Sequence, residues 1–272
     1  MEIFNLSSTN SSVGGWHKNH REYSIVSITD NSAITAGRLR VGFIPAGDRI
    51  AHQVLRSVRH DHANIDSVHN CGESNPGEGN RGESNHWQAL LTSREGNFQQ
   101  HWPASPVMQE LHEQPSTSRG RLVLLVGGAG KSHWSASVEE DSRENGNIKG
   151  DKRNRIVLDV AVRLQEAAQW LGSSYDLAAG NEEAEITQVD AQTIRITGQC
   201  LGEQCLGEQC LGEQCLGKQV IILEILPSPQ TATAQWRVEP RNSTGTGFSL
   251  EVDASNISIP STVRWKYAIT TV

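Results

Sequence analysis

The sequence has few of the residues that mark several protein classes. Phe, Trp and Tyr make up only 5% of the 272 residues, and there are two Met. A transmembrane helix needs about 20 consecutive apolar residues, whereas the longest apolar run, residues 122–126, leads straight into a glycine-rich stretch. Neither the glycine period of collagen nor a sustained heptad pattern is present. Together, 36% hydrophobic residues and 25 Gly approach the composition of a globular protein.

Cysteine and positive charge are also scarce. The five Cys are odd in number and four of them lie in a repeat, so we expect no disulfide framework and a reducing, cytoplasmic location. The first residues show no basic region, apolar stretch or cleavage site of a secretory signal. The formal net charge of −7 disfavours nucleic acid, and we expect no membrane partner. Other partners and the oligomeric state stay open.

Two low-complexity segments interrupt the chain. Residues 71–85 repeat Gly-Glu-Ser-Asn and hold no large apolar residue, which is typical of a mobile loop. Residues 199–218 hold four copies of Gln-Cys-Leu-Gly-Glu, the last ending in Lys. A period of five forms no single face in a helix or a strand, and the Cys spacing fits no zinc or iron–sulfur pattern. The repeat is therefore interpreted as an inert insertion between two strands, with a thiol or metal cluster as the alternative.

Most of the remaining sequence predicts β-strands. Apolar residues alternate with polar ones in residues 155–164 and 263–270, as expected of half-buried strands. Further strands are predicted at residues 23–28, 38–44, 49–58, 87–93, 107–112, 121–126, 133–138, 184–189, 193–197, 220–226, 234–239 and 248–252. Only residues 164–171, before Gly172, resemble a short helix. The predicted fold is a mostly β protein, an antiparallel β-sandwich or curled multi-stranded sheet with few short helices.

The same pattern predicts the domain organisation. Residues 1–20 are a candidate disordered N-terminus, and residues 21–272 are predicted to form a single β domain. A subdomain boundary would fall in the charged stretch at 140–152. Residues 45–48 are predicted to form a tight turn between two strands.

A glycine-rich segment near the middle of the chain superficially resembles a phosphate-binding loop. The motif G-x4-G-K-[ST] requires a Gly five residues before Gly130, but Leu125 stands there. The residues after Ser132 alternate like a strand and not like the helix that the motif needs. We therefore predict that residues 127–132 join two strands as a hairpin.

All ten His lie at or before residue 133, and three of them directly precede Trp, which is more often than chance predicts. Neighbours on a strand point to opposite faces, so a buried Trp would direct its His outward. The candidate ligand-binding residues are the members or neighbours of these pairs: His133, Lys131, Ser132, Trp102, His101 and His86. No cofactor is predicted, and no catalytic residue is assigned.

Some blocks resemble a group of uncharacterised bacterial proteins. They are residues 102–106 with 111–112, 124–130 with 132–135, 159–161, and 171–175. The resemblance covers about residues 100–180 and implies no fold, activity or cofactor.

The leading functional hypothesis is a non-catalytic binding or interaction module that uses the glycine hairpin, His133 and the Trp102 segment. The alternative is a metal-dependent or acid–base enzyme that uses His133, His101 and His86. A third hypothesis is a structural protein that associates through its cysteine repeat. Whether the protein is an enzyme stays open.

Overall fold

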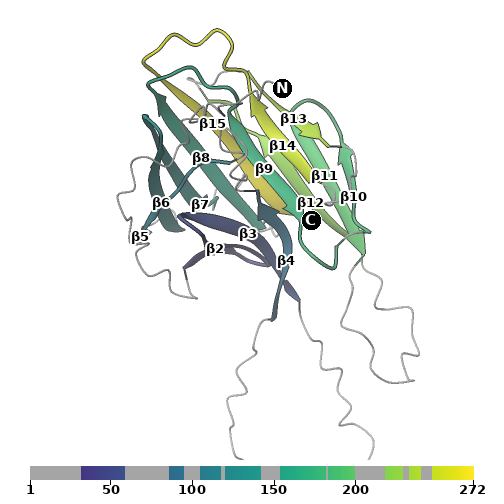
Figure 1. Ribbon diagram of the computed structural model, residues 1–272. Helices are drawn as coiled ribbons and strands as arrows, with labels where there is room; N and C mark the ends of the chain where they lie inside the picture. Colours follow the sequence, from purple (N-terminus) through teal and green to yellow (C-terminus); the bar gives the residue numbers. More distant parts are fainter. Residues whose placement is uncertain are drawn as a thin grey trace, which may run out of the picture.

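The structure is a computed structural model that describes residues 32–58, 86–94, 105–117, 120–141, 154–181, 183–199, 218–228, 233–239 and 247–272. These residues form strands joined by turns and irregular segments, and none of them is helical (Figure 1). The strands are β1 (Ala33–Ala36), β2 (Leu39–Ala46), β3 (Arg49–Val58), β4 (His86–Ser93), β5 (Glu110–Thr117), β6 (Gly120–Ala129), β7 (Ser132–Glu140), β8 (Asn154–Leu164), β9 (Gly172–Leu177), β10 (Glu185–Gln188), β11 (Thr193–Gln199), β12 (Lys218–Ile225), β13 (Ala234–Val238), β14 (Gly247–Val252) and β15 (Ser261–Thr271). Within the described ranges, no helix could cross a membrane.

The strands form two large antiparallel sheets. The seven-stranded sheet has the order β1-β2-β3-β4-β9-β14-β13, and the eight-stranded sheet has the order β10-β11-β12-β15-β8-β7-β6-β5. Neither order returns to its first strand, so neither sheet closes into a barrel. The predicted all-β, antiparallel fold class is confirmed.

Aromatic side chains from both sheets meet in the core. Trp236 of β13 and Phe248 of β14 belong to one sheet, and Trp236 contacts Tyr267 of β15 in the other at 5.8 Å between ring centroids. Tyr175 of β9 makes a second contact across the sheets to Tyr267 at 6.4 Å. All four of these side chains are at most 1% exposed. The sheets therefore pack face to face, as in a sandwich.

Alternating burial explains why the clearest strands could be predicted. In β7, the residues at even positions from Ser132 to Val138 are buried, and the odd ones are exposed or half-buried. β8 and β15 follow the same pattern over most of their length. One face of each strand thus packs against the other sheet, and the other face is the outer surface.

Three two-residue hairpins connect neighbouring strands. Gly37, Gly47 and Gly130 each take the first turn position with φ near +60° (58°, 68° and 57°). Such a φ matches the primed turns that suit twisted hairpins, and glycine adopts it without strain. The predictions of a turn at residues 45–48 and of a hairpin at residues 127–132 are confirmed.

Two predictions of secondary structure are wrong. Residues 107–109 are not part of a strand: Val107, Met108 and Gln109 are buried one after another, so they do not alternate, and β5 begins only at Glu110. Residues 165–171 are not helical either, because this short connection crosses from β8 in one sheet to β9 in the other. So short a segment needs tertiary packing to become a helix, and here Leu171 instead accepts a hydrogen bond from Val252 N at 2.9 Å.

Several predicted segments lie outside the described residues: residues 1–20, the strand at 23–28, residues 71–85, and most of the repeat at 199–218. The strands beside them are paired. Val58 is opposite His86, and Gln199 is opposite Lys218, so each long segment joins two adjacent strands. Residues 140–152 likewise lie between β7 and β8, which pair with each other.

Candidate functional site at the β6–β7 hairpin

The hairpin between β6 and β7 is fixed to the rest of the molecule by its glycines. Residues 105–109 pass so close to Gly127 that a Cβ atom there would collide with the carbonyl oxygen of Val107. Gln109 N donates to Val126 O at 2.8 Å, and Gly128 N donates to Gln109 Oε1 at 3.0 Å. At Gly127 the glycine-rich sequence therefore allows close packing of two backbone segments.

The hairpin exposes two of the predicted site residues and buries a third. Lys131 lies in the turn and is exposed, Ser132 is 2% exposed, and His133 is exposed. Trp134 is 3% exposed, so the expectation that a buried Trp directs its His outward is confirmed for this pair. Ser132 Oγ is buried without a hydrogen-bond partner and does not share the exposed face of His133.

Strand register brings a cation beside His133. Arg163 of β8 is opposite His133, and on the other side His133 is opposite Gly128. Arg163 is exposed. Lys131, His133 and Arg163 thus occupy one corner of the outer face of the eight-stranded sheet, which we call the hairpin corner. Nothing in the sequence indicated the pairing of Arg163 with His133.

The residues next to the hairpin corner have short side chains. Val126, Ser135 and Ala161 are neighbours across β6, β7 and β8 on the same outer face. Val126 is 37% exposed, Ser135 is exposed, and Ala161 is half-buried. The row continues to Arg264 of β15. In the other direction the row reaches Glu110 of β5, which is half-buried. Three small side chains therefore form a floor between the acidic Glu110 and the basic Arg264, with the hairpin corner along one side.

Ion pairs neutralise the charges beyond this floor. Arg264 donates from Nε and Nη2 to the two carboxylate oxygens of Asp159 at 2.6 and 2.5 Å. This hydrogen bonding raises the pKa of Arg264 above its ordinary value. Lys266 Nζ lies 3.8 Å from both Asp159 and Glu139. Within the described part of the chain, by contrast, Lys131, His133 and Arg163 form no ion pair or side-chain hydrogen bond.

The other predicted site residues are not brought to this corner by any described contact. His86 begins β4 in the seven-stranded sheet, whereas His133 belongs to the eight-stranded sheet. His101 and Trp102 lie outside the described residues. Among the residues that the structure does describe, no group of three His, Cys, Asp or Glu side chains could hold a metal ion. A shared histidine site stays a prediction.

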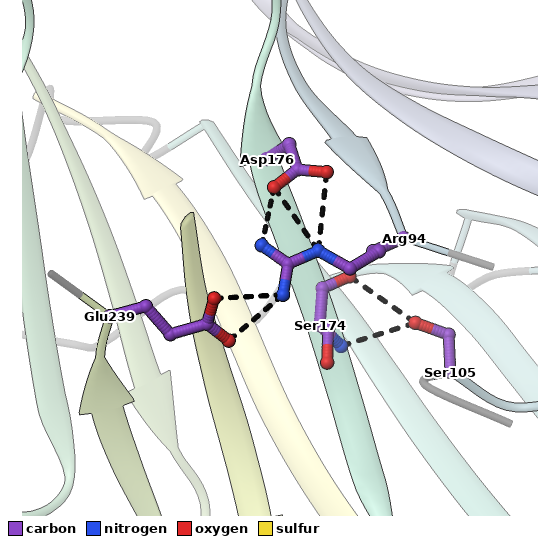
Figure 2. A network of polar contacts seen from close by, with 5 residues as sticks. All are labelled: Arg94, Ser105, Ser174, Asp176 and Glu239. Atoms are coloured by element: carbon purple, nitrogen blue, oxygen red, sulfur yellow. Dashed lines mark hydrogen bonds and ion pairs between the residues drawn. The ribbon is translucent and has the colours of Figure 1, made fainter. Parts of the chain in front are cut away.

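Arg94 is the centre of an ion-pair cluster that the sequence did not reveal (Figure 2). It follows β4 and donates to Asp176 of β9, with Nη2 to Oδ1 at 2.5 Å, and its Nη1 lies 2.9 Å from both carboxylate oxygens of Glu239. The hydrogen bond to Asp176 is the main cause that raises the pKa of Arg94. Asp176 and Glu239 are separated from Arg94 by 82 and 145 positions, so no local pattern could have shown the cluster.

A second polar network joins the two sheets inside the core. His52 Nε2 lies 2.7 Å from Tyr175 Oη, which lies 2.5 Å from Tyr267 Oη. Burial lowers the pKa of His52 to about 4 and raises the pKa of Tyr267 to about 12, so both are neutral at pH 7. Trp265 Nε1 donates to Ser173 Oγ at 3.2 Å nearby. These groups are held in the interior, and their role is to connect the sheets.

The fold defines the protein as an all-β protein of two large, open, antiparallel sheets. The hairpin corner is the exposed cationic cluster on one of them. Comparisons with protein families, with curated proteins and with solved structures find no match.

Proposed function

We propose that the protein is a non-catalytic binding module that recognises an anionic ligand at the hairpin corner. The observation that carries this proposal is that Lys131, His133 and Arg163 are exposed together on one outer corner of the eight-stranded sheet, with no ion pair to any described residue. Arginine and lysine are the usual partners of carboxylates and phosphates. This proposal adds two points to the ligand-binding hypothesis made from the sequence: a location for the site and a negative charge on the ligand.

The shape of the surface supports binding across the strands. Val126, Ser135 and Ala161 form the low floor, and Arg264 lies at its far end. A ligand can rest on this floor without displacing a long side chain. The whole chain carries a net charge of −7, so the hairpin corner is a local attraction for anions on a molecule that otherwise repels them.

The surroundings of His133 favour binding over catalysis. Its cross-strand neighbours are Gly128 and Arg163, and neither can accept or orient its proton as a carboxylate would. The hydroxyl of Ser132 is buried on the opposite side of the strand. Ser135 is exposed on the same face as His133, but no hydrogen bond between described residues joins the two. A nucleophile–base pair at this corner is therefore not formed by the described residues.

The proposal is tested by titrating the protein with citrate, a small trivalent carboxylate, at low ionic strength. We expect the double variant Lys131→Gln/Arg163→Gln to bind citrate about threefold to tenfold more weakly, because each exposed charge contributes a few tenths of a kcal/mol to about 1 kcal/mol. Added salt should weaken binding to the wild type more than to the variant.

Arg195→Gln is the matched control. Arg195 is also exposed on the outer face of the eight-stranded sheet, on β11, away from the hairpin. It should leave citrate affinity unchanged. An equal loss in both proteins would indicate a general charge effect and contradict a specific site, as would a wild type that does not bind citrate.

A further inference from the structure

Another cation, Arg56, lies at a different place, between the two sheets, and forms no ion pair with any residue that the structure describes. Arg56 of β3 is only 7% exposed. Its side chain lies on the inward face of β3, as do those of Ile50 and Val54, which are 3% and 0% exposed. A buried guanidinium normally has an acidic partner, because removing its charge from water costs free energy.

Arg56 lacks such a partner among the described residues. Its Nη2 donates to Oε1 of Gln88, a neutral amide, at 3.1 Å. Its Nε is buried and has no hydrogen-bond partner. Its two cross-strand neighbours are Leu39 of β2 and Gln88 of β4, and neither can carry a charge. Within the described part of the chain, no negative charge therefore compensates the positive charge of Arg56.

A second unpaired polar atom lies at the same end of the molecule. Thr271 Oγ1 is buried without a partner, on the inward positions of β15. Thr271 is opposite Asn154, whose side chain fills the place where a Cβ of Gly37 would lie. Gly37 belongs to the β1–β2 turn, and Arg38 O of that turn accepts from Ser57 N at 2.9 Å, next to Arg56. Both unpaired groups thus lie at the end where β3 and β15 finish.

We propose that this end of the sandwich is a binding site for a carboxylate group, with Arg56 as its cationic anchor and Thr271 as a hydroxyl donor. The flat guanidinium offers Nε and Nη2 side by side, which suits the two oxygens of a carboxylate. A carboxylate carries the single negative charge that one arginine balances. A phosphate, with up to two charges, would leave an excess in a buried place. This site is independent of the hairpin corner.

Sodium acetate is the probe, compared with sodium chloride at the same ionic strength. Acetate at ten times its Kd should raise the Tm of the wild type by about 3–5 °C, because it binds only the folded state. The variant Arg56→Met should not respond to acetate. Without acetate, its Tm should equal or exceed that of the wild type, since replacing a buried, unpaired charge with an apolar side chain of similar size removes a cost.

Two further variants and one spectroscopic measurement sharpen the test. Thr271→Val should reduce the response to acetate, and Arg195→Met, which alters an exposed arginine, should keep it. In an NMR spectrum of the wild type, the Nε–Hε resonance of Arg56 is identified by its absence from the spectrum of Arg56→Met. Acetate should shift this resonance in the wild type, and that shift is measured without reference to the Tm of any variant.

Three outcomes would overturn the proposal. The first is a wild type whose Tm and Arg56 resonance do not respond to acetate. The second is an Arg56→Met variant that is strongly destabilised or unfolded without acetate, because Arg56 would then already have its partner within the protein. The third is a larger response to phosphate than to acetate, which would contradict the carboxylate class. Failure here leaves the citrate test of the hairpin corner unaffected, because that test uses other residues.

Discussion

At the scale of single residues, the contact between Arg94 and Gly247 shows how strongly one side chain constrains a neighbouring position. Arg94 contacts Glu239 through Nη1 (Figure 2). A Cβ atom at Gly247 of β14 would collide with Arg94 Nη2. The same Cβ would lie 2.9 Å from both Asp176 Oδ1 and Tyr175 O. Glycine is required here by space. The positive φ of the hairpin glycines plays no part at this position.

This constraint predicts a coupled pair of substitutions. Gly247→Ala should lower the free energy of unfolding by about 1–3 kcal/mol, since the Arg94 ion pairs must move. In an Arg94→Ala background the same change should cost clearly less, because the nearest colliding atoms are gone. A double-mutant cycle by urea denaturation measures the difference.

Gly198→Ala on β11 is the control for that cycle. Its Cβ would meet only Ala184 Cβ at 3.7 Å, an ordinary contact, so its effect should stay within about 0.5 kcal/mol. If Gly247→Ala costs the same with and without Arg94, then Arg94 is not what excludes a side chain there.

At the scale of elements, the sequence predicts strands where only one face is buried. β7, β8 and β15 alternate and were found, but β9 was missed because its first four residues are all buried. In β9, Tyr175 faces the core, while the backbone of Ser174 is paired with the hydroxyl of Ser105 at 3.1–3.2 Å. Burial on both faces removes the alternation that a pattern needs. β1 was missed as well, because three of its four residues are buried and do not alternate with exposed ones.

The candidate site, too, could be predicted only in part from the sequence. The hairpin and the outward direction of His133 follow from local spacing and glycine content, and both could be predicted. The neighbourhood of Arg163 could not be predicted, because it depends on the register between β7 and β8, which no local pattern fixes. The pairs formed by Arg94 and by Arg264 depend on strands far apart in the sequence, as does the isolation of Arg56.

The cysteine repeat provides a prediction at this scale. Gln199 and Lys218 are opposite each other at the ends of β11 and β12, so a two-residue turn can replace the residues between them. Replacing residues 200–217 with Asn-Gly should leave the fold intact and raise the free energy of unfolding by up to about 2 kcal/mol, the closure entropy of the longer loop.

Chemical denaturation and far-UV circular dichroism of the shortened protein test this interpretation. A loss of more than about 1 kcal/mol, or a loss of β-structure, would show that the repeat stabilises the protein and is not an inert insertion.

At the scale of the whole molecule, the two sheets are connected by neutral polar groups as well as by aromatic packing. His52 comes from β3, Tyr175 from β9 and Tyr267 from β15, so their hydrogen bonds cross from one sheet to the other. Burial keeps the imidazole of His52 uncharged at neutral pH, because it lowers the pKa of that ring. Protonation of His52 is therefore a way in which pH acts on the association of the sheets.

This arrangement predicts loss of stability in mild acid. The pKa of His52 is about 4 in the folded protein, below the ordinary value of 6.5. The unfolded state thus binds the proton more readily, so the stabilising effect is complete above pH 6.5 and is lost as the pH falls towards 4. This change in pKa corresponds to a loss of up to about 3 kcal/mol in the free energy of unfolding.

The contribution of His52 is measured by comparing the wild type with His52→Gln between pH 7 and pH 4. The variant should lose less stability over this interval, because its amide does not titrate, while His112→Gln, at an exposed position, should behave like the wild type. Parallel curves for the wild type and His52→Gln would show that His52 is not the group responsible.

The most direct test of the proposed binding function is a map of the bound ligand on the folded protein. In a two-dimensional 15N-resolved NMR titration with citrate, the largest saturable shifts should fall on residues 131–135 and 161–163, with residues 195–197 of β11 unchanged. If citrate causes no saturable shifts, or if its largest shifts lie away from the β6–β7 hairpin, the hairpin corner is not the binding site.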